Sequence, residues 1–176
     1  MEFAKLVLRC LLVIAGSGAI AGGISALFCP EAFTLGRPPA FGNLPAPLLG
    51  FIWGLLDFLV PGIVVGLAVG SAANTGHKPA VKALFFRKPL WAHAVFILII
   101  GAMSGVIGFV AVKNGHWEML GPVSAATDPA RHPFLGAASW AWRGAHLANL
   151  ASGVTLAVWT WRKRTEFDAM VRAKQG

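Results

Sequence analysis

Four long apolar stretches dominate this chain, at residues 6–28, 47–70, 91–112 and 137–161. Each reaches or exceeds the roughly 20 residues with which an α-helix crosses a hydrocarbon core about 30 Å thick. Only 12% of the residues are charged, whereas a soluble domain has about 25%. We therefore predict an all-α membrane protein, a bundle of four transmembrane helices that forms a single integral membrane domain over residues 1–176.

The basic residues predict how these helices are oriented. Lys5 and Arg9 lie before or at the start of the first stretch, and the opposite connections contain only Arg37, Lys113 and Arg131. Apart from Arg143 within the fourth stretch, the other basic residues lie between the second and third stretches or after the fourth: Lys78, Lys82, Arg87, Lys88, Arg162, Lys163, Arg164, Arg172 and Lys174. By the positive-inside rule both termini are cytoplasmic, in a multi-pass protein of the bacterial inner (plasma) membrane. Because the net charge of +8 is sorted in this way, we expect no nucleic acid partner.

Both ends of the chain leave alternatives open. Residues 162–176 are expected to form a short cytoplasmic tail, either solvated or lying as an amphipathic helix on the anionic inner leaflet. The first stretch also has features of a signal peptide, whose removal would leave three helices. Its apolar run continues through Leu27, beyond the usual 7–15 residues, which favours an uncleaved helix. Cys10 and Cys29 would lie about 28 Å apart along that helix, too far for a disulfide.

Small residues recur at intervals of four in the apolar stretches. Gly18 and Gly22 lie in the first stretch, Gly50 and Gly54 in the second. This GxxxG spacing lets two helix backbones approach closely. It predicts either packing within one chain or a surface for a homo-oligomer or a partner membrane subunit.

Asp57 is the residue of the second stretch that most needs an explanation. A carboxylate at membrane depth requires a partner or a function. Pro61 lies four residues later and lacks the amide hydrogen that would bond the carbonyl of residue 57. Pro61 and Gly62 could then act as a hinge.

Polar residues of the fourth stretch are the expected partners of Asp57. Arg143, His146 and Asn149 are spaced three apart, and helix rise places His146 and Asp57 at a similar depth, about 15 Å below the outer surface. We expect an intramembrane polar site in which Arg143 or His146 contacts Asp57 and Asn149 caps the free carbonyl of residue 57. Such a site is either a lock between helices or a protonatable centre.

Other candidate sites carry weaker signals. His116 and His132 share an outer connection with Glu118 and Asp128, but without compact ligand spacing, so we expect no metal. His93, close to the cytoplasmic edge, is expected to be interfacial, which also argues against a haem between it and His146. We expect no cofactor, and we find no nucleophile or paired-carboxylate arrangement that indicates an enzyme.

The run from Asp57 through Phe58, Pro61 and Gly62 follows a first helix that ends near Cys29 and Pro30. This D-[FY]-x-x-P-G pattern resembles one found in the second helix of small four-helix bacterial membrane proteins of unassigned function. The resemblance implies four helices and no particular activity.

Three hypotheses for function follow. The first is a protein that acts by helix packing and binding, as a subunit or accessory of a membrane assembly or as a module that contacts membrane lipids. The second is a proton-coupled small transporter or channel component that uses Asp57 with Arg143 or His146. The third is a membrane enzyme acting on lipid or quinone at the outer face, for which no catalytic group is evident.

Overall fold

The computed structural model describes residues 2–173, which are almost entirely helical. Its four long helices are α1 (Glu2–Phe28), α3 (Ala46–Asn74), α4 (Arg87–Lys113) and α6 (His132–Ala173). Four short helices lie in the connections: α2 (Glu31–Thr34), η1 (Ala83–Phe86), α5 (Pro122–Ala125) and η2 (Pro129–Arg131). No strand occurs between residues 2 and 173, so the all-α prediction is confirmed.

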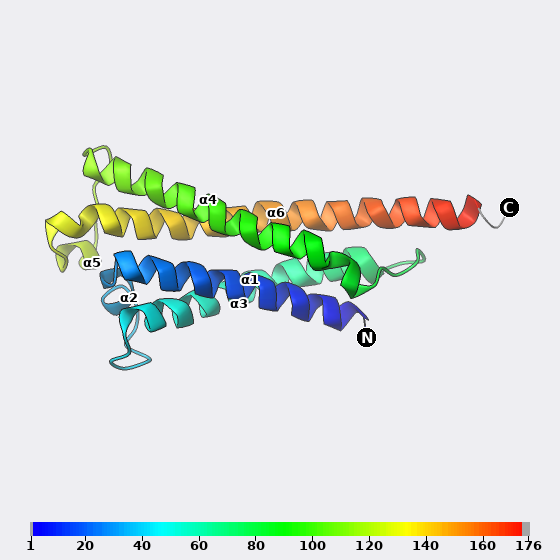
Figure 1. The fold of residues 1–176 in the computed structure, drawn as a ribbon, viewed down its shortest axis with the longest axis horizontal. Helices are drawn as coiled ribbons and strands as arrows, with labels where there is room; N and C mark the ends of the chain where they lie inside the picture. Colours follow the sequence, from blue (N-terminus) through cyan, green and yellow to red (C-terminus); the bar gives the residue numbers. More distant parts are fainter. Residues whose placement is uncertain (1, 174–176) are drawn as a thin grey trace.

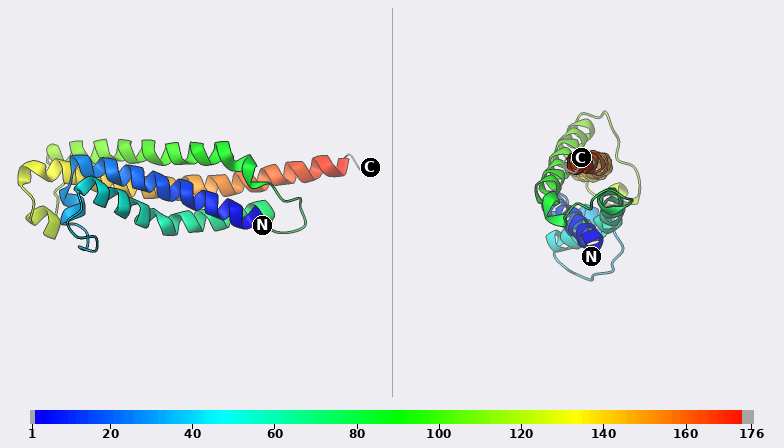
Figure 2. Two further views of the ribbon diagram at one scale, coloured as in Figure 1. Left: turned by 60° about the horizontal axis from the view of Figure 1, so that its bottom comes forward. Right: turned by 90° about the vertical axis from the view of Figure 1, so that its right-hand side faces the viewer.

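The long helices lie side by side as two pairs (Figure 1). Helix α1 packs mainly against α3, and α4 packs mainly against α6, while contacts between α3 and α6 join the pairs. The start of α1 and the end of α6 lie at one end of the elongated molecule, which we call the terminal end (Figures 1 and 2). Helices α2 and α5 lie at the other end, which we call the loop end.

Three segments are long and apolar enough to cross a membrane: Glu2–Phe28, Ala46–Asn74 and Ala83–Lys113. Among the described residues, α6 does not meet the same criterion. Polar side chains within α6, at Arg143, His146 and Asn149, reduce the hydropathy of the stretch predicted at 137–161. The fourth span therefore stays a prediction.

Glycines hold α1 and α3 at backbone contact. A Cβ atom added to Gly22 would lie 2.1 Å from the carbonyl oxygen of Gly50, and one added to Gly54 would lie 2.2 Å from that of Gly18. Only residues without a side chain allow these backbones to approach so closely. The same helices then continue in contact toward the terminal end, where Gly62 faces Leu11.

Helix α6 is longer than expected. The predicted tail at 162–176 is instead a helical continuation that runs unbroken to Ala173, and residues 174–176 lie outside the described residues. This extension projects past the other helices at the terminal end (Figure 2). Whether this segment is solvated or lies on the inner leaflet stays a prediction.

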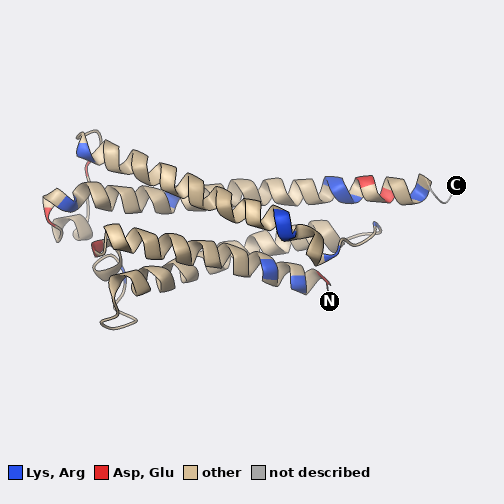
Figure 3. Ribbon diagram, viewed as in Figure 1, with Lys and Arg blue, Asp and Glu red and all other residues tan. Residues whose placement is uncertain are grey.

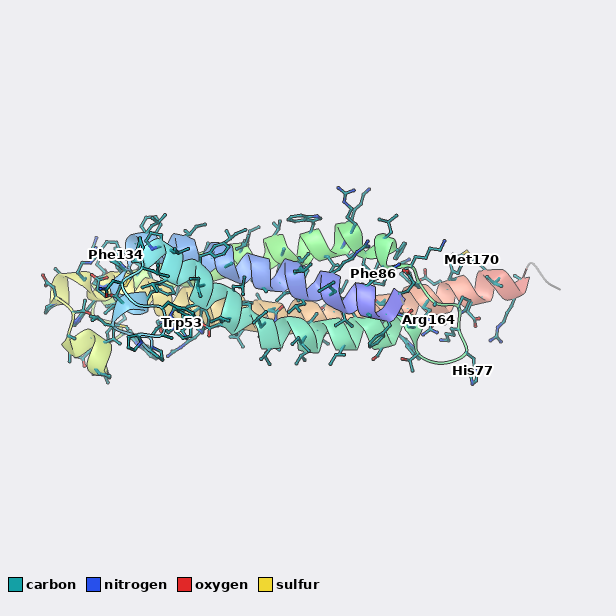
Figure 4. All side chains as sticks on the ribbon, turned by 90° about the horizontal axis from the view of Figure 1, so that it is seen from below. Trp53, His77, Phe86, Phe134, Arg164 and Met170 are labelled. Carbon is teal, nitrogen blue, oxygen red and sulfur yellow. The ribbon has the colours of Figure 1, made fainter. Side chains whose placement is uncertain are left out.

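Arg164 fixes the base of this extension. Its side chain is fully buried, and its guanidinium donates hydrogen bonds to the carbonyl oxygens of Ala72, Thr75, Lys78 and Pro79. Ala72 lies in the last turn of α3, where carbonyls have no partner within the helix and a cation is favoured. Figure 4 shows Arg164 beside the connection that follows α3. A residue expected in a tail thus caps another helix.

We predict that Gly22→Ala destabilises the protein by about 1–3 kcal/mol, because the new methyl group meets backbone atoms that cannot move aside cheaply. Gly16→Ala, the matched control on the same helix, has no atom within 4 Å of the added Cβ. That variant should be neutral or slightly more stable because alanine has the higher helix propensity. Thermal unfolding in mild detergent measures both, and equal melting temperatures for the two variants would contradict the close contact.

Candidate functional site

Asp57 forms an ion pair with Arg37, which lies in the connection between α2 and α3. Nη1 of Arg37 lies 3.2 Å from Oδ1 of Asp57, and Nη2 bonds Oδ2. Two parallel N–H···O bonds of this kind give an arginine–carboxylate pair both strength and a fixed orientation. The side chains of Arg37 and Asp57 are 25% and 20% exposed, so the pair is largely shielded.

Two tryptophans hold the guanidinium of Arg37 in place. Its Cζ lies 5.3 Å from the ring centroid of Trp53 on α3 and 4.9 Å from that of Trp142 on α6. Phe41 packs edge-on against Trp53, with ring centroids 5.4 Å apart. Trp53 lies near the loop end in Figure 4. These cation–π contacts add to the ion pair. Through Arg37, the connection at residues 35–45 thus contacts both helix pairs.

The prediction that Arg143 or His146 contacts Asp57 was wrong. Arg143 lies on an exposed face of α6, and Arg37 provides the bonds to Asp57. His146 is near the site but packs its ring on Phe58 and Trp142, and its Nδ1 lies 3.0 Å from the Trp142 carbonyl oxygen. His146 does lie level with Phe58, the neighbour of Asp57, but helix rise does not give the face on which each side chain lies.

Asn149 also has a different partner from the one expected. It is fully buried, and its Oδ1 lies 3.0 Å from Nε2 of His93 on α4. His93 is 4% exposed, so it is buried between helices, and its depth at a membrane interface stays a prediction. Six residues after the start of α4, His93 lies on the helix face that packs against α6.

The predicted hinge residues lie inside a continuous helix. Helix α3 runs from Ala46 to Asn74 with Pro61 within it, and Gly62 is buried against Leu11 of α1. The missing amide of Pro61 leaves the carbonyl of residue 57 without its usual helical partner. Hinge motion at this point stays a prediction.

A cavity of about 690 Å³ lies beside the ion pair, between α1 on one side and α4 and α6 on the other. We call it the α1–α4 cavity. Its walls are mainly apolar, with Arg37, Ser25 and Ser139 as the polar exceptions. Helices α1, α4 and α6 contribute most of the lining, including Ala21, Ile24, Ile97, Ile99, Ala102, Leu135, Ala138, Trp142 and Ala145, while Phe33, Met119, Leu120 and Val123 come from the loop end.

The outer histidines lie in different surroundings. Nε2 of His132 lies 3.0 Å from the carbonyl oxygen of Ser124, and His116 is exposed. Between residues 2 and 173, no three His, Cys, Asp or Glu side chains are grouped as metal ligands.

A second ion pair closes the loop end. Nε of Arg131 lies 3.0 Å from Oε1 of Glu31, and Nη2 of Arg131 donates to the carbonyl oxygen of Phe28 at the end of α1. The pair ties η2 to the start of α2. The hydrogen bond from Arg131 lowers the pKa of Glu31 below its ordinary value.

We predict that Asp57→Asn and Arg37→Gln are coupled in a double-mutant cycle by about 0.5–3 kcal/mol, because each removes the same ion pair. The matched cycle with Arg143→Gln should be additive within about 0.3–0.5 kcal/mol. Thermal or denaturant unfolding in mild detergent provides both values. Stronger coupling of Asp57 to Arg143 than to Arg37 would disprove the pairing.

We also predict a pH-dependent stability term from Glu31. Because its folded pKa is lowered, the carboxylate stabilises the protein at pH values above about 4.3, the ordinary glutamate pKa. That contribution is lost as the pH falls through the lower, folded pKa. Melting temperatures measured from pH 7 downward should fall less steeply for Glu31→Gln than for the unmodified protein. Parallel curves of melting temperature against pH for the two proteins would show that the Glu31–Arg131 pair adds no pH-dependent stability.

The motif from Asp57 to Gly62 lies on α3 directly at the ion pair. Its resemblance to small four-helix bacterial membrane proteins stays a prediction. Function is therefore inferred from the cavities and polar contacts themselves. No family model, curated protein or solved structure matches the chain.

Proposed function

We propose that the protein is a membrane-embedded binding module that holds the apolar chain of a lipid-like molecule in the α1–α4 cavity. The observation that carries this proposal is the cavity itself. Its volume of about 690 Å³ falls within the roughly 300–1,000 Å³ of small-molecule sites. A mainly apolar lining with few polar groups suits a hydrocarbon chain better than a charged solute.

Arg37 is the proposed contact for the polar end of this molecule. Arg37 lines the cavity, and only two of its nitrogens donate hydrogen bonds to Asp57. A guanidinium has five N–H donors, so others can meet an ester or headgroup oxygen. Because Asp57 balances the charge of Arg37, the bound molecule does not need to be an anion.

The membrane setting belongs to the same proposal. All four long helices span the bacterial inner membrane, with both termini on the cytoplasmic side. Three apolar segments support this arrangement, and so does the packing of α6 alongside them. Lys and Arg gather at the terminal end, which is the side that the positive-inside rule makes cytoplasmic (Figure 3).

Close packing at small residues holds the module together in this setting. Lipid chains are as apolar as the helix surfaces, so glycine contacts such as Gly22 with Gly50 supply the attraction between helices. Membrane lipids are the proposed partners. A homo-oligomer or a partner subunit would use the apolar side chains that remain exposed on the long helices.

We predict that a phospholipid with a photoreactive group in its acyl chain labels the cavity walls at residues 97–102 and 138–145. The double variant Ala102→Leu with Ala138→Leu fills this space and should reduce labelling there severalfold. Ala68→Leu is the control, because Ala68 is exposed on α3 and does not line the α1–α4 cavity. Peptide mass spectrometry after irradiation in vesicles measures the adducts.

Labelling spread evenly over all lipid-facing helix surfaces, unchanged in the filled variant, would contradict binding in the cavity. The second candidate, a proton-coupled transporter or channel component, would then take precedence if the same vesicles carry a proton flux. An acidic side chain paired with an arginine from a connection favours this candidate. Asp57→Asn should abolish such a flux, and Arg143→Gln should leave it intact.

A further inference from the structure

A second polar site lies between α4 and α6, away from the α1–α4 cavity. His93 and Asn149 are 4% and 0% exposed, and their side chains are joined by a 3.0 Å contact between Nε2 and Oδ1. They belong to helices that are paired along most of their length. Neither residue lines the α1–α4 cavity.

This pair retains hydrogen-bonding capacity that the described residues do not satisfy. Nδ1 of His93 and Nδ2 of Asn149 are buried and have no partner between residues 2 and 173. Buried polar groups in proteins are normally hydrogen-bonded, and an apolar membrane makes an unpaired one more costly. Both atoms therefore call for a further hydrogen-bonding group.

The chemistry of that group follows from the pair. If Nε2 of His93 donates to Oδ1 of Asn149, the imidazole Nδ1 remains an acceptor and the amide Nδ2 remains a donor. If the amide is turned over, the amide nitrogen donates to Nε2, so the imidazole keeps a donor and the amide keeps an acceptor. Either arrangement leaves at least one donor and one acceptor free. A neutral hydroxyl group can bond the imidazole nitrogen in either arrangement, because a hydroxyl both donates and accepts.

His93 also lines a second cavity. It has a volume of about 490 Å³ and lies on the α4–α6 side of the molecule. Ser152 and Thr155 line it, but their hydroxyls already donate to carbonyl oxygens one turn back on α6. The rest of the lining is apolar, with Phe96, Leu156 and Trp159 among its larger side chains.

We propose that this cavity binds an amphiphile with a free hydroxyl headgroup, which donates a hydrogen bond to Nδ1 of His93 and whose apolar chain lies along Phe96 and Leu156. His93 lies six residues inside α4, about 9 Å from its start by helix rise. The hydroxyl of a lipid-like alcohol can reach that depth with its chain held among the apolar residues of the cavity. The site is independent of the proposed function of the α1–α4 cavity.

The test compares two probes on the unmodified protein in vesicles. One is a photoreactive sixteen-carbon alcohol, and the other is its methyl ether, which accepts a hydrogen bond but cannot donate one. We expect the alcohol to label residues 89–96 and 151–159 about fivefold or more above the ether, the effect of one hydrogen bond. Equal labelling by the two probes overturns the proposal and leaves ordered water as the group that meets His93.

Variants then locate the contact. His93→Phe should bring the alcohol down to the level of the ether, whereas Ser152→Ala, which changes a lining hydroxyl already bonded within α6, should keep the difference. The melting temperature of each variant shows whether it is folded. A folded His93→Phe protein that still prefers the alcohol contradicts the site. Ala102→Leu with Ala138→Leu should not affect this labelling, so the outcomes at the two cavities are separable.

Discussion

The carboxylate of Asp57 is placed on an otherwise apolar stretch of α3, and its need for a cation determines how the loop end closes. Arg37 meets that need from the connection after α2, and Trp53 and Trp142 fix the guanidinium from two different helices. A flexible connection is thereby attached to both helix pairs. This attachment also forms part of the wall of the α1–α4 cavity, because Arg37 and its neighbour Gly36 line it.

Polar contacts between distant parts of the chain recur along the length of the molecule. Glu31 and Arg131 join the two loop-end connections, His93 and Asn149 join α4 to α6, and Arg164 joins the end of α6 to the end of α3. In an apolar setting each polar group strongly favours a partner, so each contact also selects which helix faces meet. Glycine contacts then bring the selected faces to backbone distance, as between Gly22 and Gly50.

Helices were predictable from this sequence because apolar length alone indicates them, and α1, α3 and α4 lie where the first three stretches were expected. Side-chain partners were less predictable. Counting residues gives depth along a helix but not its rotation, so Arg143 was expected at Asp57 although it lies on an exposed face. Arg37 is the single basic residue of the 29–46 connection, and this could have identified it as the partner of Asp57. Arg164 was misjudged because its place in a charged run indicated an exposed tail, whereas packing against the end of α3 buries it.

Arg164 also has a mechanical consequence. The helix continues for nine residues beyond it, to Ala173, a length of roughly 14 Å. Since the guanidinium is bonded to four backbone carbonyls around the end of α3, this segment is joined to α3 and to α6 at the same point. A sideways force on the end of this segment would therefore act on α3 and α6 together, because no flexible residues separate it from them.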